Sequence, residues 1–433
     1  MRFQTLDQWL SWQEGLHPSA IDLGLERVRT VLQGLDHPRL GCPVITVAGT
    51  NGKGSSVAML EAIYLAAGYR VGAYTSPHLL RYNERIRIDG EPVADRSLMD
   101  AFAHIDQVRG HTSLTYFEFG TLAAIEIFAA AAPDVVILEV GLGGRLDAVN
   151  VLDADVALIT PIALDHADWL GDDRESIGRE KAGVMRRDRP AVCGDPDPPA
   201  SLQQTADALG ARLYRLGQDF SALDQDSQWR WRCNDRIRDA LPPPALRGVF
   251  QRDNAAAVLM VVELLAARLP VSQAHVREGL ANVRVPGRFQ VVAGAVPLIL
   301  DVAHNPQAAQ ALAASLSAWS MPGEVYAVTA VMADKDIQAM FSAMAGVVDH
   351  WCLTTVALPR AATAAQLDEI LQRAVPGAAS EQYPDVAAAL RALESRLRPH
   401  DRVVVFGSFY TVAAALAEDY NAGFPRPNQA EVK

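Results

Sequence analysis

Short apolar runs alternate along the chain with longer segments whose apolar residues recur at helical spacing. Residues 43–48 form a nearly continuous apolar run that stops at a glycine, which is typical of a strand buried on both faces. The next segment places Val57, Leu60 and Tyr64 one helical turn apart and stops at Gly68. The same pattern predicts further strands at Tyr69–Tyr74, Val135–Val140, Val156–Thr160 and Ala191–Cys193.

The stretch Ser227 to Pro244 interrupts this alternation. It combines closely spaced aromatic and arginine residues with three consecutive prolines, and we interpret it as a hairpin followed by a loop. A helix is expected at Asn254–Ala267, and the alternation resumes beyond Phe289. The later strands are predicted at Leu298–Val302, Val325–Val331, Trp351–Val356 and Val403–Phe406.

Strands that alternate with helices favour right-handed crossovers and mostly parallel sheets. We therefore predict an α/β protein of two domains, residues 1–287 and 288–433, the second smaller and Rossmann-like. The apolar stretch Phe119–Val140 is broken by Glu126, Pro133 and Asp134, so it predicts a helix and a strand and no membrane span.

Composition narrows the possible partners. The net charge of −12 argues against nucleic acid as the main partner, because binding a phosphate backbone needs a basic face. The four cysteines are widely separated, which excludes zinc-type spacing and favours free thiols in a reducing cytoplasm. The first 14 residues lack the apolar core of a signal peptide.

The segment Gly49-Thr50-Asn51-Gly52-Lys53-Gly54-Ser55 lies between a predicted buried strand and a predicted helix. Glycines let backbone N–H groups turn towards an anion, and the helix N-terminus adds positive potential. A lysine here supplies a mobile positive charge for phosphate. The common loop ends Gly-Lys-Ser/Thr, whereas here Gly54 precedes the hydroxyl of Ser55. We predict nucleotide binding by Asn51, Gly52, Lys53, Gly54 and Ser55.

This loop variant resembles that of the Mur ligase superfamily, and the motifs around it resemble those of the bifunctional dihydrofolate synthase/folylpolyglutamate synthase family. The similarity extends from Leu23 to the Gly407-Ser408-Phe409 turn. The motifs are Thr75-Ser76-Pro77-His78-Leu79, Tyr116-Phe117-Glu118, Leu138 to Asp147 (LEVGLGGRLD), Ala163-Leu164-Asp165-His166, Glu180-Lys181-Ala182-Gly183, Pro286-Gly287-Arg288 and Asp301-Val302-Ala303-His304-Asn305-Pro306.

The resemblance implies that ATP phosphorylates a pteroate or folate carboxylate and that the amine of L-glutamate attacks the acyl phosphate. It implies magnesium, in two sites, with Ser76, Glu139 and His166 as ligands. Glu139 suits magnesium because a hard cation prefers oxygen. By hardness alone Asp165 or Asp168 would be chosen over His166, and Asp165 stays open as the alternative ligand.

In similar enzymes the lysine that corresponds to Lys181 is carbamylated and holds a second magnesium. Carbamylation needs a neutral amine, hence a pKa lowered by burial or by positive charge. The alternative is a surface lysine on an amphipathic helix beside Arg179 and Arg186. Together with Lys53 and His304, Lys181 is predicted to be catalytic.

The resemblance also brings Asn254, Arg288 and Asp301 to the nucleotide. Arg288 is expected at a hinge, where closure could bring its guanidinium to phosphate. Family members often have a histidine where this chain has Phe250, so that side chain is lost here. His304-Asn305-Pro306 is expected to open a helix near the glutamate or acyl phosphate, with Asn305 as a helix cap in either case.

For the pterin, the resemblance points to three segments. An aromatic ring can stack on the pterin and a carboxylate can pair with an aminopyrimidine edge, although Phe117 could equally be a core residue. The predicted pterin residues are Asp22, Leu23, Gly24, Leu25, Thr115, Tyr116, Phe117, Glu118, Leu146, Asp147 and Ala148.

The phosphate loop alone is also compatible with three other functions. A folylpolyglutamate synthase without the dihydrofolate synthase step is the nearest alternative, and residues 22–25 favour the bifunctional enzyme. A peptidoglycan ligase would need a UDP-binding domain, for which about forty residues before the loop leave no room. A P-loop regulatory module would not need Glu139, His166 and Lys181. We expect a cytoplasmic monomer that binds dihydropteroate, reduced folates, L-glutamate and ATP, with no nucleic-acid or membrane partner.

Overall fold

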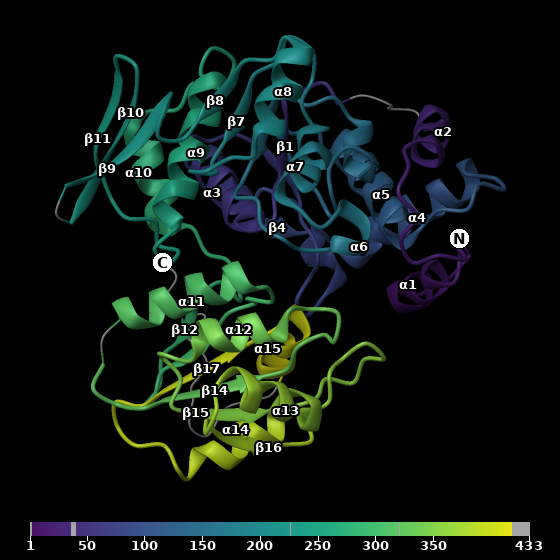
Figure 1. Cartoon of the computed structure of the whole chain (residues 1–433). Helices are drawn as coiled ribbons and strands as arrows, with labels where there is room; N and C mark the ends of the chain where they lie inside the picture. The colour runs from purple at the N-terminus through teal and green to yellow at the C-terminus, as the bar shows by residue number, and fades with distance from the viewer. Residues whose placement is uncertain (1, 36–39, 226, 320, 418–433) are drawn as a thin grey trace. The chain divides into compact units, whose positions relative to one another are not determined.

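The computed structural model of the chain describes residues 2–35, 40–225, 227–319 and 321–417 (Figure 1). These residues form two compact units. The first comprises residues 1–245 and 252–283, and the second residues 246–251 and 284–433. Both units are α/β with mostly parallel sheets, as the hydrophobic pattern predicts. In the described parts of the chain, no helix combines the length and the apolar character needed to cross a bilayer.

The first unit is built on an eight-stranded sheet of order β4-β3-β2-β5-β1-β6-β7-β8. In this order, each strand from β2 through β5, β1, β6 and β7 to β8 is parallel to its neighbour. At the other edge, β3 pairs antiparallel with both β2 and β4. Their bounds are β1 (Val44–Ala48), β2 (Val71–Tyr74), β3 (Ile86–Ile88), β4 (Glu91–Pro92), β5 (Val135–Glu139), β6 (Val156–Ile159), β7 (Ala191–Cys193) and β8 (Leu213–Arg215).

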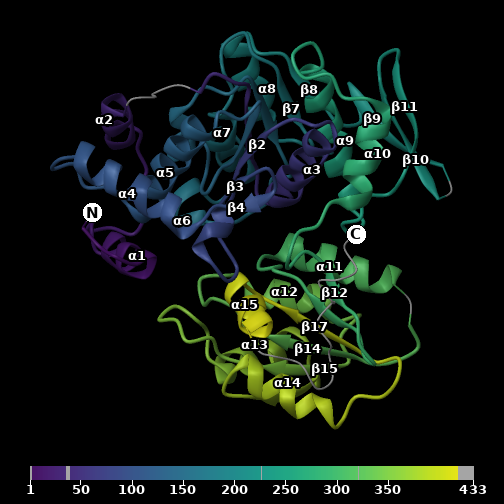
Figure 2. The same cartoon turned by 180° about the vertical axis from the view of Figure 1, so that it is seen from behind.

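Helices cover this sheet, and β1 is buried along its whole length. Figure 2 shows α1, α2, α4 and α5 gathered near the N-terminus. The helices are α1 (Leu6–Glu14), α2 (Glu26–Gly34), α3 (Lys53–Ala66), α4 (Asp95–Val108), α5 (Tyr116–Ala131), α6 (Ala167–Leu170), α7 (Arg174–Ala182), α8 (Ala200–Leu209), α9 (Gln251–Leu264) and α10 (Gln273–Asn282), with 3-10 turns η1 (Tyr82–Arg85) and η2 (Ala148–Val151).

The hairpin predicted between Ser227 and Pro244 is confirmed as β10 and β11, and β9, which precedes that segment, extends it to a three-stranded antiparallel sheet of order β11-β10-β9 beside α9 and α10 (Figures 1 and 2). Trp229 and Trp231 lie two positions apart on β10, and both are buried. The Trp231 indole N–H donates to the Ala256 carbonyl at 3.0 Å. The additional strand, β9, carries one aromatic residue, Phe220, against the two tryptophans of β10. The strands are β9 (Phe220–Gln225), β10 (Gln228–Cys233) and β11 (Arg236–Leu241).

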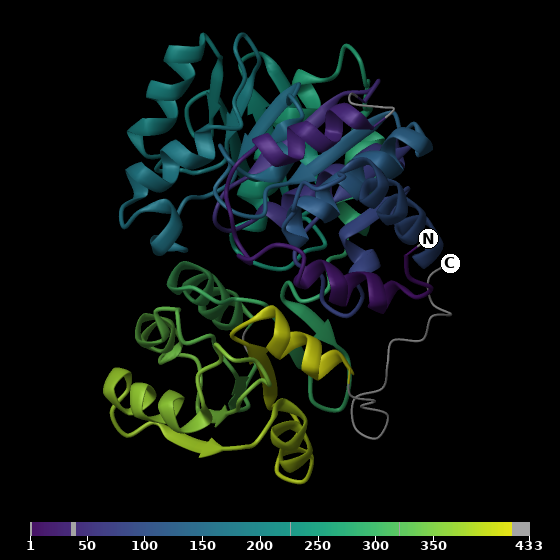
Figure 3. The same cartoon turned by 90° about the vertical axis from the view of Figure 1, so that its right-hand side faces the viewer.

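The second unit has a six-stranded sheet of order β12-β13-β17-β14-β15-β16, antiparallel only at β12. Helices flank its strands, as Figure 3 shows in green and yellow. The elements are β12 (Gln290–Val292), β13 (Leu298–Leu300), β14 (Val325–Thr329), β15 (His350–Leu353), β16 (Ala379–Gln382) and β17 (Arg402–Phe406), with α11 (Pro306–Ala318), α12 (Ile337–Met344), α13 (Ala364–Ala374), α14 (Val386–Glu394) and α15 (Phe409–Ala417).

Candidate active site

The glycine-rich loop joins the carboxyl end of β1 to the start of α3, so it lies at a helix N-terminus. Gly52 has a φ of +91° and precedes the first helical residue, Lys53. Gly49 has a φ of +143°, and a Cβ there would lie 1.8 Å from the Thr160 hydroxyl oxygen. The loop therefore requires glycine at both positions, and its backbone is arranged to receive an anion.

Two lysines from distant segments converge on one carbonyl oxygen of this loop. The Lys53 ammonium donates to the Gly49 carbonyl at 3.1 Å, and the Lys181 ammonium donates to the same oxygen at 2.8 Å. Lys181 belongs to α7 and is only 4% exposed. Burial, assisted by the charge of Lys53, lowers the pKa of Lys181 from 10.5 to about 7. The interpretation of Lys181 as a surface lysine is therefore wrong.

The three predicted metal ligands lie at or after the carboxyl ends of three strands of the sheet, of which β2 and β5 are neighbours and β6 is separated from β5 by β1. Ser76 follows β2, Glu139 is the last residue of β5, and His166 follows β6. The backbone N–H of Ser76 donates to a Glu139 carboxylate oxygen at 3.3 Å, so these two residues lie together. Glu139 is 4% exposed. Their roles as ligands stay predictions.

His166 and Asp165 share the loop before α6. The His166 backbone N–H donates to Asp165 Oδ1 at 2.9 Å, and its imidazole Nε2 lies 4.0 Å from Asp165 Oδ2. The Asp165 carboxylate raises the pKa of Lys181 slightly, against the larger lowering effects of burial and of Lys53. Among the described residues no three His, Cys, Asp or Glu side chains could hold a metal ion by themselves. One carboxylate, a serine hydroxyl and an imidazole still fit magnesium, which usually binds one or two carboxylates together with substrate phosphates and waters.

Asn254 lies against the phosphate loop. A Cβ added to Gly52 would lie 2.8 Å from the Asn254 side-chain oxygen, and Asn254 is buried in α9. Ser55, the last residue of the loop segment, lies in the first turn of α3 and is also buried, with 2% of its surface exposed. These contacts place Asn254 at the loop of the first unit, whereas its contact with a nucleotide stays a prediction.

Arg288, Asp301 and His304 lie together in the second unit. The Arg288 guanidinium carbon lies 5.2 Å from the ring centre of Phe409, and the His304 ring lies 6.2 Å from the same phenyl ring. Asp301 accepts from the backbone N–H groups of Phe289 and Ala303, both at 2.8 Å. Burial raises the pKa of Asp301, although Arg288 opposes this shift.

His304 precedes the start of α11. Its Nδ1 lies 2.8 Å from the Val302 carbonyl oxygen, which holds the ring orientation. Asn305 caps α11 by accepting from the Ala308 N–H at 2.9 Å, and Pro306 is the first helical residue. The capping predicted for Asn305 is confirmed.

Arg27 joins two of the predicted pterin segments and was missed in the sequence. Its guanidinium donates to Asp22 Oδ2 at 2.8 Å and to Glu118 Oε1 at 3.0 Å. The Glu118 side chain is 4% exposed, against 42% for Asp22. The other Glu118 oxygen accepts from the Thr115 N–H at 2.8 Å in a capping box at α5. Glu118 is therefore an internal anchor, and Asp22 is the more accessible carboxylate.

The third predicted pterin segment, residues 146–148, leads into η2. Asp147 is buried and accepts from the N–H groups of Leu142 and Val149 at 2.8 and 3.0 Å. Burial raises its pKa to about 6, against the lowering effect of these N–H groups and of Lys53. Phe117 is half-buried, with its ring 5.9 Å from that of Tyr74, and a Cβ on Gly141 would lie 2.7 Å from it.

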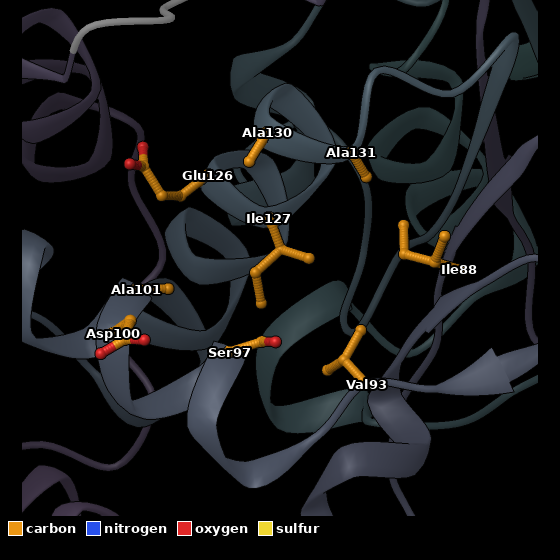
Figure 4. A pocket seen from close by; sticks show the side chains of 9 residues that line it. All are labelled: Ile88, Val93, Ser97, Asp100, Ala101, Glu126, Ile127, Ala130 and Ala131. Carbon is orange, nitrogen blue, oxygen red and sulfur yellow. The ribbon is translucent and has the colours of Figure 1, made fainter.

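A separate pocket of about 590 Å³ contains none of the predicted site residues (Figure 4). It lies where β3, α4 and the C-terminal half of α5 meet. Ile88, Val93 and Ile127 form its apolar walls, and the carboxylates of Asp100 and Glu126 lie on one side. The His104 ring already pairs with Glu126 at 2.7 Å.

Residues 287–409 match the family described as "Mur ligase, glutamate ligase domain". The chain is 46% identical over 411 residues to a dihydrofolate synthase/folylpolyglutamate synthase of Escherichia coli, covering 95% of this chain and 94% of that protein. It is 40% identical to the protein of the same name from Haemophilus influenzae, covering 94% and 96%.

Solved structures agree with this assignment. E. coli FolC in complex with DHPP and ADP has a TM-score of 0.91 and 45% identity, covering 95% of this chain and 97% of that chain. The Yersinia pestis bifunctional folylpolyglutamate synthase/dihydrofolate synthase complexed with AMPPNP and Mn ion has a TM-score of 0.88 and 48% identity, covering 96% and 98%. The α/β architecture of two domains is thereby confirmed. The chain belongs to the bifunctional dihydrofolate synthase/folylpolyglutamate synthase family of ATP-dependent Mur-type ligases.

Proposed function

We propose that this chain ligates L-glutamate to dihydropteroate, giving dihydrofolate, and to the glutamate tail of reduced folates. A substrate carboxylate oxygen attacks the γ-phosphorus of ATP, which forms an acyl phosphate and releases ADP. The glutamate amine then attacks the acyl carbon, phosphate leaves, and an amide remains. The observation that carries this proposal is the convergence of Lys53 and Lys181 on the Gly49 carbonyl at a helix N-terminus.

Phosphoryl transfer needs positioning and neutralisation of the charge on the transferred group. Lys53 is at hand for the β- and γ-phosphates, because its ammonium rests on loop carbonyls that it can leave when an anion enters. Ser76, Glu139 and His166 would hold magnesium, with Asp165 as the alternative ligand. Magnesium would supply charge neutralisation for the phosphates.

We propose that Lys181 is carbamylated by carbon dioxide and supplies an anionic oxygen ligand for a second magnesium. Its amine is substantially neutral near pH 7, because burial and Lys53 lower its pKa to about 7. A neutral amine is the species that attacks carbon dioxide. The 2.8 Å bond to the Gly49 carbonyl places it at the phosphate loop.

For the nucleotide we propose Asn51, Gly52, Gly54, Ser55 and Asn254 from the first unit. The second unit would contribute Arg288 and Asp301, and His304 would act on the glutamate or acyl phosphate. A joint role is supported because Arg288 and His304 both lie against the Phe409 ring and both lower the pKa of the buried Asp301 carboxyl. We further propose that the enzyme acts in the cytoplasm as a monomer.

For the pterin we propose the segments 22–25, 115–118 and 146–148. Arg27 supports this grouping because it joins Asp22 to Glu118. In this arrangement the Phe117 ring is available for stacking, and Glu118 holds the segment in place.

The test is glutamate-dependent ADP release, measured separately with dihydropteroate and with a reduced folate. Release with both substrates supports the bifunctional enzyme. Release with the reduced folate alone would identify the alternative, a folylpolyglutamate synthase that lacks the dihydrofolate synthase step. No release with either substrate would refute the proposal.

A further inference from the structure

Arg85, the last residue of η1, is a buried guanidinium without a carboxylate partner. It is 9% exposed, and in the described part of the chain no Asp or Glu side chain forms an ion pair with it. Its neighbours differ: Arg87 pairs with Glu61 at 2.7 Å, and the exposed Arg81 pairs with Asp95 at 3.0 Å. An arginine cannot lose its proton, so a buried one carries a desolvation cost that a counter-ion normally offsets.

The groups around Arg85 hold it in place without neutralising its charge. Its Nε donates to His78 Nδ1 at 2.9 Å, and its guanidinium carbon lies 5.3 Å from the Tyr82 ring centre and 5.6 Å from that of Tyr116. The nearest acidic residue in the chain, Glu84, accepts three backbone N–H groups with its carboxylate oxygens, those of Leu79, Leu80 and Arg81.

The position of Arg85 connects two parts of the proposed site. Its carbonyl accepts from the Thr75 N–H at 2.8 Å, next to Ser76, whose own N–H donates to Glu139. Its guanidinium stacks near Tyr116, which is a predicted pterin residue. The acyl substrate of the proposed reaction must span these parts, with its ring system at one end and its carboxylate near the phosphates at the other.

We propose that Arg85 binds a carboxylate of the acyl substrate. The planar guanidinium matches a carboxylate with two parallel hydrogen bonds, and stacked tyrosines keep it oriented before the substrate arrives. This inference rests on the proposed function. It adds a substrate-binding residue outside the phosphate loop, the predicted metal ligands and the predicted pterin segments.

The test compares the affinity of the enzyme for pteroic acid with that for pteroamide, the neutral amide of the same molecule, by titration calorimetry. The unsubstituted enzyme should prefer the acid by about 10-fold to 100-fold, since hydrogen bonds between charged groups are strong. Arg85→Gln should reduce this ratio to near one, and Arg85→Lys should keep part of it. Arg81→Gln, a change of a nearby exposed arginine, should leave the ratio unchanged.

A purely structural role for Arg85 would weaken binding of both molecules equally, and that result would overturn the inference. Retention of the full ratio in Arg85→Gln would overturn it too. If Arg85→Gln does not fold, the ratio in Arg85→Lys decides: an undiminished ratio would contradict the bidentate contact. Failure of the proposed function is distinct, because the unsubstituted enzyme would then release no ADP with dihydropteroate.

Discussion

Two regions of the first unit differ in whether a carboxylate neutralises their cationic side chain. At the phosphate loop, Lys181 is held by the Gly49 carbonyl and forms no ion pair among the described residues. At the junction of α2 and α5, Arg27 lies between the carboxylates of Asp22 and Glu118. A cation already neutralised by the protein fixes its partners, whereas one supported by carbonyls alone is available to an incoming anion or to chemical modification. The region around Lys181 is therefore suited to bind an anion or to be modified, whereas the region around Arg27 holds its segments in a fixed arrangement.

Of the substitutions that test this comparison, Lys53→Ala should have the largest effect on activity. It removes the mobile charge of the phosphate loop, so kcat/KM should fall by about 10³-fold or more while the melting temperature stays close to that of the parent. ADP release and thermal melting measure the two quantities. Lys53→Arg is the control that keeps the charge, and unchanged activity in Lys53→Ala would remove this residue from the mechanism.

Lys181→Met should lower kcat by about 100-fold, because it removes the amine and the carbamate that it would form. Enzyme equilibrated with ¹³C-bicarbonate should show a carbamate carbon resonance that is absent from the variant. The resonance should grow as the pH rises through about 7, the pKa of Lys181, where the amine becomes neutral. Its absence at pH 8 in active enzyme would contradict carbamylation.

The same residue predicts a pH dependence of stability. Its pKa is lower in the folded state, about 7 against 10.5, so between these values the unfolded chain binds more protons. The contribution of Lys181 to stability therefore improves as the pH rises through this window. Lys181→Met should stabilise the fold more at pH 7 than at pH 10, measured without carbon dioxide. An equal gain in stability at pH 7 and pH 10 would show that folding does not lower the pKa of Lys181.

Arg27→Ala should have the smallest effect on turnover and a clear effect on binding and stability. Loss of Arg27 leaves the buried Glu118 carboxylate without its cation, which costs about 3 kcal/mol. The KM for dihydropteroate should rise about tenfold with kcat changed less, as expected for lost positioning. Denaturant unfolding and steady-state kinetics measure these values.

Arg29→Ala is the matched control on the same helix, because Arg29 is half exposed and pairs with the exposed Glu26. Arg27→Ala combined with Glu118→Gln should recover part of the lost stability, since the unpaired charge is then gone. If Arg27→Ala and Arg29→Ala behave alike, the junction has no role in shaping the site.

The sequence was sufficient to predict the central strands of both large sheets and the phosphate loop, because these elements depend on local patterns. The strands at or next to the sheet edges, β3, β4, β8, β12 and β16, were not predicted, because they are short and several carry polar residues. The apolar run of β1 and the glycines at 49 and 52 act within a few residues of one another. Arg27 and Arg85 were not predicted, because their roles depend on which side chains the fold brings close. Arg27 meets a glutamate 91 positions away, and Arg85 has no carboxylate partner among the residues that the structure describes, which no local pattern reveals.

The order of strands in the first sheet has a consequence for synthesis of the chain. The ribosome completes the phosphate loop early, but the two strands that flank β1 are β5 and β6. Val44 pairs with Val136, and Ile45 pairs with Val156. A nascent chain that ends before β6 therefore presents the loop on an incomplete sheet. ATP can act as a folding ligand for this unit only after residue 159 has left the exit tunnel, so chaperones that reach the chain earlier meet an exposed apolar strand.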